Sequence, residues 1–256
     1  MRKFGWFVLI LIAIAGPTYL LRVQPGQARS GRRLLYLTMS AGFKHDSIPL
    51  SREIVKEIGE KSGAFETVFA DDVSPFTAEN LRIYDAVMFY TTGELPFTEV
   101  QKTIFSGYMA AGHGFIGVHS ATDTLYMWDE YSKIIGGYFD GHPWHQEVTI
   151  DVVDPKNKIV SFLGKSFQIN DEIYQIDDFR DDSNVLLRLD PMSVDRTKPG
   201  VHHRYYNWPL AWTRRYGKGR VFYTALGHEQ DVWRNHWFQQ LLFNGIEWTM
   251  GDLKEK

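Results

Sequence analysis

Short apolar segments alternate with helical segments through the first half of the chain, and no other feature constrains the fold as strongly. Four of these segments are predicted to be strands, at residues 32–38, 65–70, 85–90 and 115–118. Helices are predicted between them, over residues 49–61, 77–83 and 98–111. Strands and helices that alternate at this spacing form a parallel sheet with right-handed crossover connections.

The pattern changes in the second half, where predicted strands follow one another without helices. These strands and a final amphipathic helix cover residues 147–153, 168–176, 184–189, 210–215, 220–225 and 236–249. We therefore predict one α/β domain over residues 32–251. We expect a Rossmann-like or flavodoxin-like, mostly parallel sheet with helices on both faces, extended by antiparallel strands.

Residues 1–28 are predicted to be a signal peptide or a single N-terminal membrane anchor. Arg2 and Lys3 precede an apolar run over residues 4–21, whose length lies between that of a signal sequence and that of a spanning helix. Residues 26–28 offer a small-x-small cleavage pattern, while arginines on both flanks leave the orientation open. We expect an exported protein, periplasmic or extracellular, that is either secreted or tethered through residues 4–21.

The composition excludes several kinds of site. The chain has no cysteine, which rules out a thiol nucleophile, a zinc–thiolate centre and a lipidated N-terminal cysteine. The net charge is −3 and no basic stripe is present, so we expect no nucleic acid partner. The 8 Trp, 13 Tyr and 17 Phe residues suit a large core and are also compatible with a sugar-binding cleft.

The segment from Gly114 to Asp123 predicts a buried strand that runs into a tight turn of small residues around His119. In α/β folds such a turn lifts one side chain above the carboxyl edge of the sheet, where ligands bind. Hydrolases and amidotransferases of this shape carry Ser or Cys there, whereas this chain carries an imidazole. His119 therefore indicates proton transfer or metal ligation, and a serine hydrolase using Ser120 is a third interpretation.

Other polar residues follow predicted strands, and the loops after parallel strands gather at one edge of a sheet. We expect several of them to meet in one pocket. The predicted catalytic residues are His119, His142 and Glu172. The predicted substrate-binding residues are His45, Glu94, Ser120, Asp123, Trp144, Tyr174 and His228. The remaining histidines, which we interpret as surface or capping residues, are His113, His202, His203 and His236.

Two kinds of chemistry are compatible with these residues. His142 and His145, three residues apart, could bind a divalent metal together with Glu172, and such ligands suit zinc, manganese or iron. Alternatively, a histidine could act as a general acid or base on a sugar, with Glu172 as its partner. No phosphate-binding loop and no complete dinucleotide motif is present, so nucleotide binding has no support.

Several ordered motifs resemble the ThuA family, named for trehalose utilisation, whose fold is that of class I glutamine amidotransferases. These motifs are Gly117–Asp123 (GVHSATD), Gly136–Pro143 (GGYFDGHP), Asp171–Tyr174 (DEIY), Pro209–Trp212 (PLAW), Gly217–Tyr223 (GKGRVFY) and Leu226–His228 (LGH). The resemblance implies sugar metabolism, with 3-keto-glycosides or disaccharides as substrates. The amidotransferase elbow cysteine is absent, so glutaminase activity by the thioester route is not expected.

Two functional hypotheses follow. In the first, the protein is an enzyme that acts on a glycoside or keto-sugar by hydrolysis, elimination or isomerisation. In this hypothesis His119 and His142 handle protons or a metal, and Tyr174, Trp144 and Trp212 contact the sugar. In the second, it is a non-catalytic carbohydrate-binding or interaction domain on the same scaffold. The sequence leaves the oligomeric state open.

Overall fold

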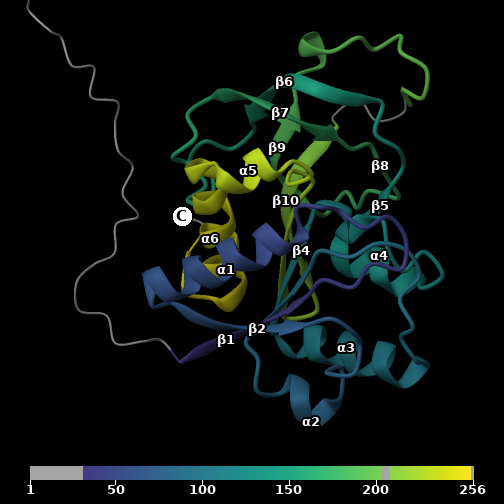
Figure 1. Cartoon of the computed structure of the whole chain (residues 1–256), viewed down its shortest axis with the longest axis vertical. Coiled ribbons are helices and arrows are strands. Elements are labelled where there is room, and N and C mark those ends of the chain that lie inside the picture. Colours follow the sequence, from purple (N-terminus) through teal and green to yellow (C-terminus); the bar gives the residue numbers. More distant parts are fainter. Residues whose placement is uncertain (1–30, 203–207, 255–256) are drawn as a thin grey trace, which may run out of the picture.

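The computed structural model describes residues 31–202 and 208–254, and within them nine strands form one central sheet (Figure 1). Five neighbouring strands pair in parallel: β2 (Phe65–Ala70), β1 (Arg32–Leu37), β3 (Ala86–Phe89), β4 (Gly114–Val118) and β11 (Gly219–Thr224). The sheet continues through antiparallel pairs into β10 (Pro209–Tyr216), β9 (Asn184–Leu189), β6 (Trp144–Val152) and β7 (Ser166–Ile173). The predicted parallel sheet with an antiparallel extension is confirmed.

Helices cover both faces of the parallel part, as predicted (Figure 1). One face carries three helices that contact one another: α1 (Ile48–Ser62), α5 (Gln230–Arg234) and α6 (His236–Met250). The other face carries α2 (Ala78–Leu81), α3 (Glu99–Ala111) and α4 (Asp129–Ile135). Because both faces are covered, the central strands β3 and β4 are buried along their whole length.

Close packing sets the position of α6 on the sheet. A Cβ atom at Gly245 would overlap the ring of Phe222 on β11, so only glycine allows the helix to lie this near the strand. The loop between β11 and α5 carries His228, and α6 follows directly after α5. This packing therefore helps to determine where His228 lies.

Helix ends follow the expected chemistry in one case and depart from it in another. Thr98 begins α3 with a capping box, in which its hydroxyl accepts from the Gln101 amide and the Gln101 side chain accepts from the Thr98 amide. Ser47 occupies the position before α1 that usually caps a helix, but its hydroxyl does not cap this helix. It bonds instead with the hydroxyl of Tyr90 at 2.8 Å, because both groups are buried and need a partner.

Several short elements were not predicted. They are α4, α5, the 3-10 turns η1 (His119–Thr122) and η2 (Pro191–Ser193), and the small antiparallel pair β5 (Tyr138–Phe139) and β8 (Ile176–Asp177). Such elements are too short to show a hydrophobic period. Strand β6 begins at Trp144 rather than at residue 147, and the helix predicted over residues 77–83 shrinks to the four residues of α2.

Residues 1–28, predicted as a leader, and His203 lie outside the described residues. Among the helices that the structure describes, none combines the length and the apolar character needed to span a membrane.

Candidate functional site

His119 is the first residue after β4 and begins the turn η1. Its φ angle is +46°, in the left-handed region that residues with a side chain seldom adopt. Gly117, two residues earlier, lets neighbouring side chains pack closely against the end of β4, since a Cβ atom there would lie 2.9 Å from the side chains of Ile135 and Tyr223. The predicted sharp turn that presents His119 at the carboxyl end of the strand is therefore present.

The imidazole of His119 is fully buried, and its surroundings determine which nitrogen carries the proton. Nδ1 lies 2.7 Å from the carbonyl oxygen of Ala225, which can only accept, so the neutral ring is protonated at Nδ1. Nε2 then presents a lone pair, to which the Tyr174 hydroxyl donates at 3.0 Å. Burial raises the pKa of Tyr174 well above its ordinary value, so the hydroxyl keeps its proton.

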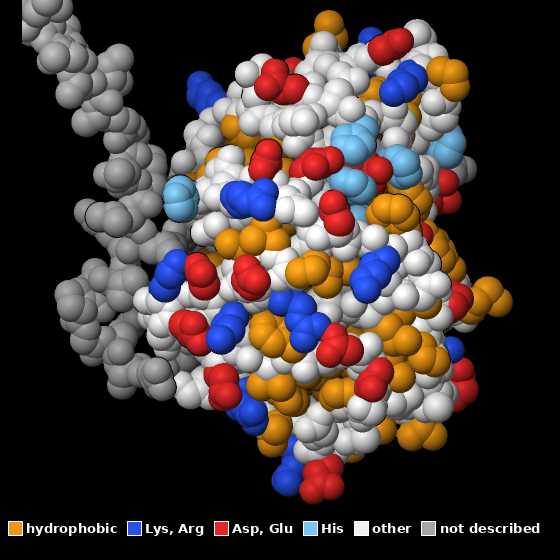
Figure 2. Space-filling model, in the orientation of Figure 1, with side chains coloured by type: hydrophobic (Ala, Val, Ile, Leu, Met, Phe, Trp, Pro, Cys, Tyr) orange, Lys and Arg blue, Asp and Glu red, His pale blue; other side chains and the backbone are white. Residues whose placement is uncertain are grey.

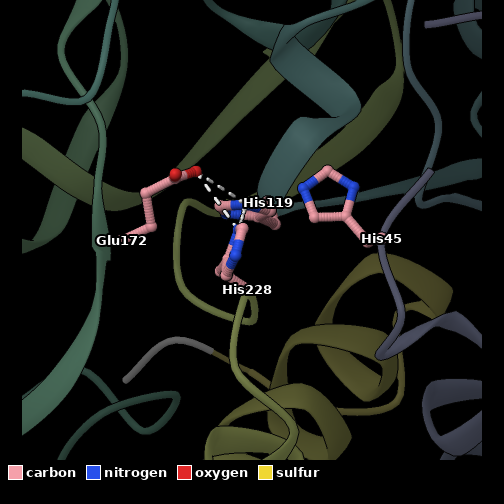
Figure 3. A group of neighbouring side chains, drawn as sticks. All are labelled: His45, His119, Glu172 and His228. Atoms are coloured by element: carbon pink, nitrogen blue, oxygen red, sulfur yellow. Dashed lines mark hydrogen bonds and ion pairs between the residues drawn. The ribbon is translucent and has the colours of Figure 1, made fainter. Parts of the chain in front are cut away.

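Four side chains from distant parts of the chain meet at this point, as Figure 3 shows: His45, His119, Glu172 and His228. One nitrogen or oxygen atom of each lies within 4.8 Å of the others. Nδ1 of His228 is 3.2 Å from both Nε2 of His119 and Oε2 of Glu172. The same two atoms of His119 and Glu172 are 3.5 Å apart. The loops after β1 and β11, the end of β4, and strand β7 therefore build one site.

His142 joins this cluster at its rim. Its Nδ1 lies 3.1 Å from Oε1 of Glu172, the carboxylate oxygen that faces away from His228. The His142 side chain is 50% exposed and that of Glu172 only 9%. His142 is thus accessible from solvent while it contacts the buried carboxylate.

Charge in the cluster is concentrated on Glu172 and His228. Burial alone would raise the pKa of Glu172, but its hydrogen bond with His228 and the surrounding imidazoles outweigh this and hold the pKa well below the ordinary value. Burial lowers the pKa of His228, yet the bond to Glu172 and the nearby acidic groups raise it more, so the net shift is upward. Glu172 is therefore a carboxylate with imidazoles on two sides.

His45 lies edge-on to His119, with ring centroids 4.9 Å apart, and is buried. Its Nδ1 has no hydrogen-bond partner among the described residues. Burial, together with the neighbouring imidazoles, lowers the pKa of His45 to about 3, so the ring is neutral at pH 7. A buried nitrogen without a partner costs free energy and calls for an explanation from the chemistry of the site.

The structure separates the metal ligands predicted from the sequence. His142 contacts Glu172, but His145 lies within β6 and its Nε2 is 2.7 Å from Oε1 of Glu229. Together with Glu229 and His228, His145 forms a second, more exposed group beside the first. The ligand atoms of His142, His145 and Glu172 are therefore not gathered at one point, because His145 contacts an acid on the loop after β11, and a metal bound by this set stays a prediction.

Two residues predicted to contact a substrate are fully buried. Trp144 is fully buried, and its indole nitrogen donates to the carbonyl oxygen of Asp195 at 2.9 Å, so it belongs to the core. Ser120 is also fully buried, and its hydroxyl has no hydrogen-bond partner among the described residues. A serine nucleophile needs a histidine in contact, so the geometry gives the serine hydrolase interpretation no support. Trp212 is buried as well and packs in the core.

Asp123 and Glu94 form hydrogen bonds with the segment that follows η1. The Asp123 carboxylate accepts from the Tyr126 hydroxyl at 2.7 Å, and Glu94 accepts from the Met127 amide at 2.8 Å. Burial raises the pKa of Asp123. Both acids therefore have a structural partner, and their predicted contacts with a substrate stay predictions.

Asp171 is fully buried, although its place in the sequence suggests a solvated strand end. Its carboxylate accepts from the amides of Gly227 at 2.8 Å and Glu229 at 3.1 Å, on either side of His228. Neighbouring residues of a strand point to opposite faces, so Asp171 holds the His228 loop while Glu172 points into the cluster.

Sequence reasoning also missed Phe43, whose ring is 65% exposed beside the cluster. Its centroid lies 4.9 Å from that of His45 and 6.4 Å from that of His228, stacked on the latter. Figure 2 shows histidine and acidic side chains gathered beside each other on this face of the molecule. An exposed aromatic ring next to buried polar groups is a typical feature of a ligand-binding site.

Comparison with known protein families identifies the family of this chain. Residues 33–249 match the ThuA family, which is described as trehalose utilisation. The chain belongs to the ThuA family. The match covers every side chain of the cluster, from His45 to His228.

Solved structures agree on the fold. A ThuA-like protein from Bacteroides uniformis superposes with a TM-score of 0.72 at 22% identity, over 88% of this chain and 95% of the other. A second ThuA-like protein, from Parabacteroides merdae, gives 0.67 at 21% identity, over 88% and 92%. A protein from Thermoplasma acidophilum that is described as a GMP synthase component gives 0.50 at 9% identity, over 84% and 92%. A search of curated proteins yields no match by sequence.

Proposed function

We propose that this ThuA-family protein is an enzyme that processes a sugar, with a 3-keto-glycoside or an oxidised disaccharide as its substrate. The observation that carries the proposal is the placement of Glu172, whose two oxygens contact the half-exposed His142 on one side and the buried His119 and partly buried His228 on the other. The description of the family as trehalose utilisation supports a sugar as the ligand.

A 3-keto-sugar needs little from a protein to react. The C3 carbonyl acidifies the C2–H bond, so a base that takes this proton leaves its electron pair to form an enolate. In elimination, this pair expels the glycosidic oxygen at C1, which leaves with a proton. In isomerisation, the pair takes up a proton at C2 from the opposite face. Elimination and isomerisation therefore share one requirement, a proton-transfer group opposite a group that stabilises negative charge on the carbonyl oxygen.

The cluster contains candidates for both roles. His142 is the proton-transfer group, because its Nδ1 contacts Glu172 and its ring is half exposed at the mouth. Imidazole is the usual side chain for proton transfer near neutral pH. His228, whose pKa is raised, contacts the other oxygen of the Glu172 carboxylate and can donate a hydrogen bond to the developing oxyanion.

The test is turnover of oxidised and unoxidised disaccharides by wild-type protein and two variants. Glu172→Gln and His142→Ala are each expected to lower kcat/KM by roughly 10²–10⁴-fold. The first variant removes the carboxylate that contacts His142, and the second removes the proton-transfer group itself. His236→Ala, which removes an exposed imidazole from the start of α6, serves as the matched control and is expected to keep wild-type activity.

Two outcomes would contradict the enzyme proposal. Sugar binding without turnover by the wild-type protein would favour a non-catalytic carbohydrate-binding domain. Full activity of both variants would show that the chemistry takes place elsewhere. A measurement of melting temperature for each variant separates loss of function from loss of folding.

We also propose that the protein acts outside the cytoplasm. This proposal rests on the apolar run over residues 4–21 after Arg2 and Lys3, which is typical of an export signal or a membrane tether.

A further inference from the structure

The buried cluster has the spacing of a metal-binding site. The atoms concerned are Nε2 of His119, Nδ1 of His228 and Oε2 of Glu172, and their mutual distances are 3.2, 3.2 and 3.5 Å. A tetrahedral ion bound at about 2.0–2.1 Å separates its ligand atoms by about 3.3–3.4 Å. We propose that these three residues, with His45, bind one divalent transition-metal ion at the carboxyl end of β4.

The protonation pattern of His119 supports a metal. Its Nδ1–H donates to the Ala225 carbonyl at 2.7 Å, which fixes the ring. The Nε2 lone pair accepts from the Tyr174 hydroxyl at 3.0 Å in this structure, and an ion would bind it in exchange for that bond. Metal-bound histidines generally donate their second nitrogen to a backbone carbonyl or carboxylate in this way. The ring is fully buried, so this orientation is not a consequence of contact with solvent.

His45 supplies a second, independent observation. It is only 4% exposed, and its Nδ1 lacks a hydrogen-bond partner among the described residues. One of its ring nitrogens lies within 4.8 Å of the ligand atoms of the other three residues. A buried imidazole that the protein does not satisfy is available to an ion, and Figure 3 shows it beside His119, across from Glu172.

The ligand set indicates the class of ion. Three imidazoles and one carboxylate are suited to zinc, iron, cobalt, nickel or manganese rather than to calcium or magnesium, which take oxygen ligands. Residues around this set orient its members, as is usual at metal sites. Oε1 of Glu172 contacts His142, and Asp171 accepts hydrogen bonds from the loop that carries His228. An ion of this class polarises a carbonyl oxygen, and this catalytic role rests on the proposed function.

Metal binding is tested without any sugar. The full-length protein is stripped with a chelator, and Zn²⁺ and Mn²⁺ are titrated separately by calorimetry, with melting temperature as a second readout. We expect one equivalent to bind and to raise the melting temperature. His228→Gln and Glu172→Gln are expected to weaken binding roughly 100-fold or more, since loss of a residue that merely supports a ligand already costs about 10–100-fold.

The control is His236→Ala, which removes an exposed imidazole and is expected to bind like wild type. The proposal is overturned if neither ion binds the wild-type protein more tightly than about 1 mM, or if both Gln variants bind it unchanged. Because the two variants alter different residues, failure of one to fold leaves the other as the test. If the ion binds but no sugar is turned over, the site stands and the proposed function fails.

Discussion

At the scale of the residue, His119 distinguishes this chain from the amidotransferases whose fold it shares. It occupies the turn after β4 with φ +46°, a conformation that costs about 1 kcal/mol or more for a residue with a side chain. With an imidazole there and no cysteine in the chain, the thioester route of glutaminases is closed. The strained turn instead fixes a histidine beside Glu172 and His228.

The buried His45 makes a prediction about acid stability. Its pKa is lowered to about 3 in the folded protein, whereas an unfolded histidine titrates near 6.5. Between these values the unfolded chain binds a proton that the folded chain does not. The free energy of unfolding therefore falls as the pH falls below about 6.5, by up to about 1.4 kcal/mol per pH unit from this group.

The measurement is urea unfolding of the metal-free protein at pH 7 and pH 5. His45→Gln is expected to lose roughly 1–2 kcal/mol less stability between the two pH values than wild type does. His236→Gln, at an exposed position, should retain the wild-type difference. An unchanged difference in His45→Gln would show that His45 is not held in its neutral form.

At the scale of the element, strand β7 supports the site from both of its faces. Glu172 points into the cluster, and Asp171 accepts the amides of Gly227 and Glu229 in the loop after β11. Sequence neighbours on one strand thus provide a site residue and the support for His228. The alternation of side chains along a strand directs the two neighbours to opposite faces.

Asp171→Asn tests this support. The asparagine side chain keeps one acceptor oxygen, so one of the two amides beside His228 loses its bond and the loop loosens. We expect sugar turnover to fall by roughly 10–100-fold, as is typical when a residue that orients a functional side chain is lost. Asp231→Asn, an exposed change nearby, is the control, and equal activity of the two variants would argue against a supporting role for Asp171.

At the scale of the whole molecule, the site forms where the parallel sheet meets its antiparallel extension. Strand β11 pairs in parallel with β4 and antiparallel with β10, so the loop after β11 reaches His119. The extension then brings β7 and its acidic pair to the same place. Each part supplies residues that the other lacks, and neither builds the cluster alone.

Export is tested on the full chain. Leu11→Arg places a charge in the middle of the apolar run over residues 4–21, at a cost of about 2.5–3.5 kcal/mol for a spanning segment. Cell fractionation is expected to find the wild-type protein in the membrane, in the periplasm or outside the cell, and the variant in the cytoplasm. The same distribution for both proteins would contradict a role of this run in export.

Local patterns in the sequence determined much of the architecture. The parallel strands, the helices between them and the turn at His119 each follow from a few neighbouring residues. These features depend on local backbone geometry and on the side chains of nearby residues, which is why they could be predicted. The motifs likewise identified His119, Glu172 and His228 as functional candidates.

The tertiary structure decided which of the candidates meet. His119 and His228 are 109 residues apart, and only the pairing of β11 with β4 brings them to 3.2 Å. His142 and His145 are near in sequence, yet they contact different acids, because His145 lies in a strand and His142 precedes it. Burial of Trp144 and support by Asp171 likewise depend on long-range packing, which no local pattern records.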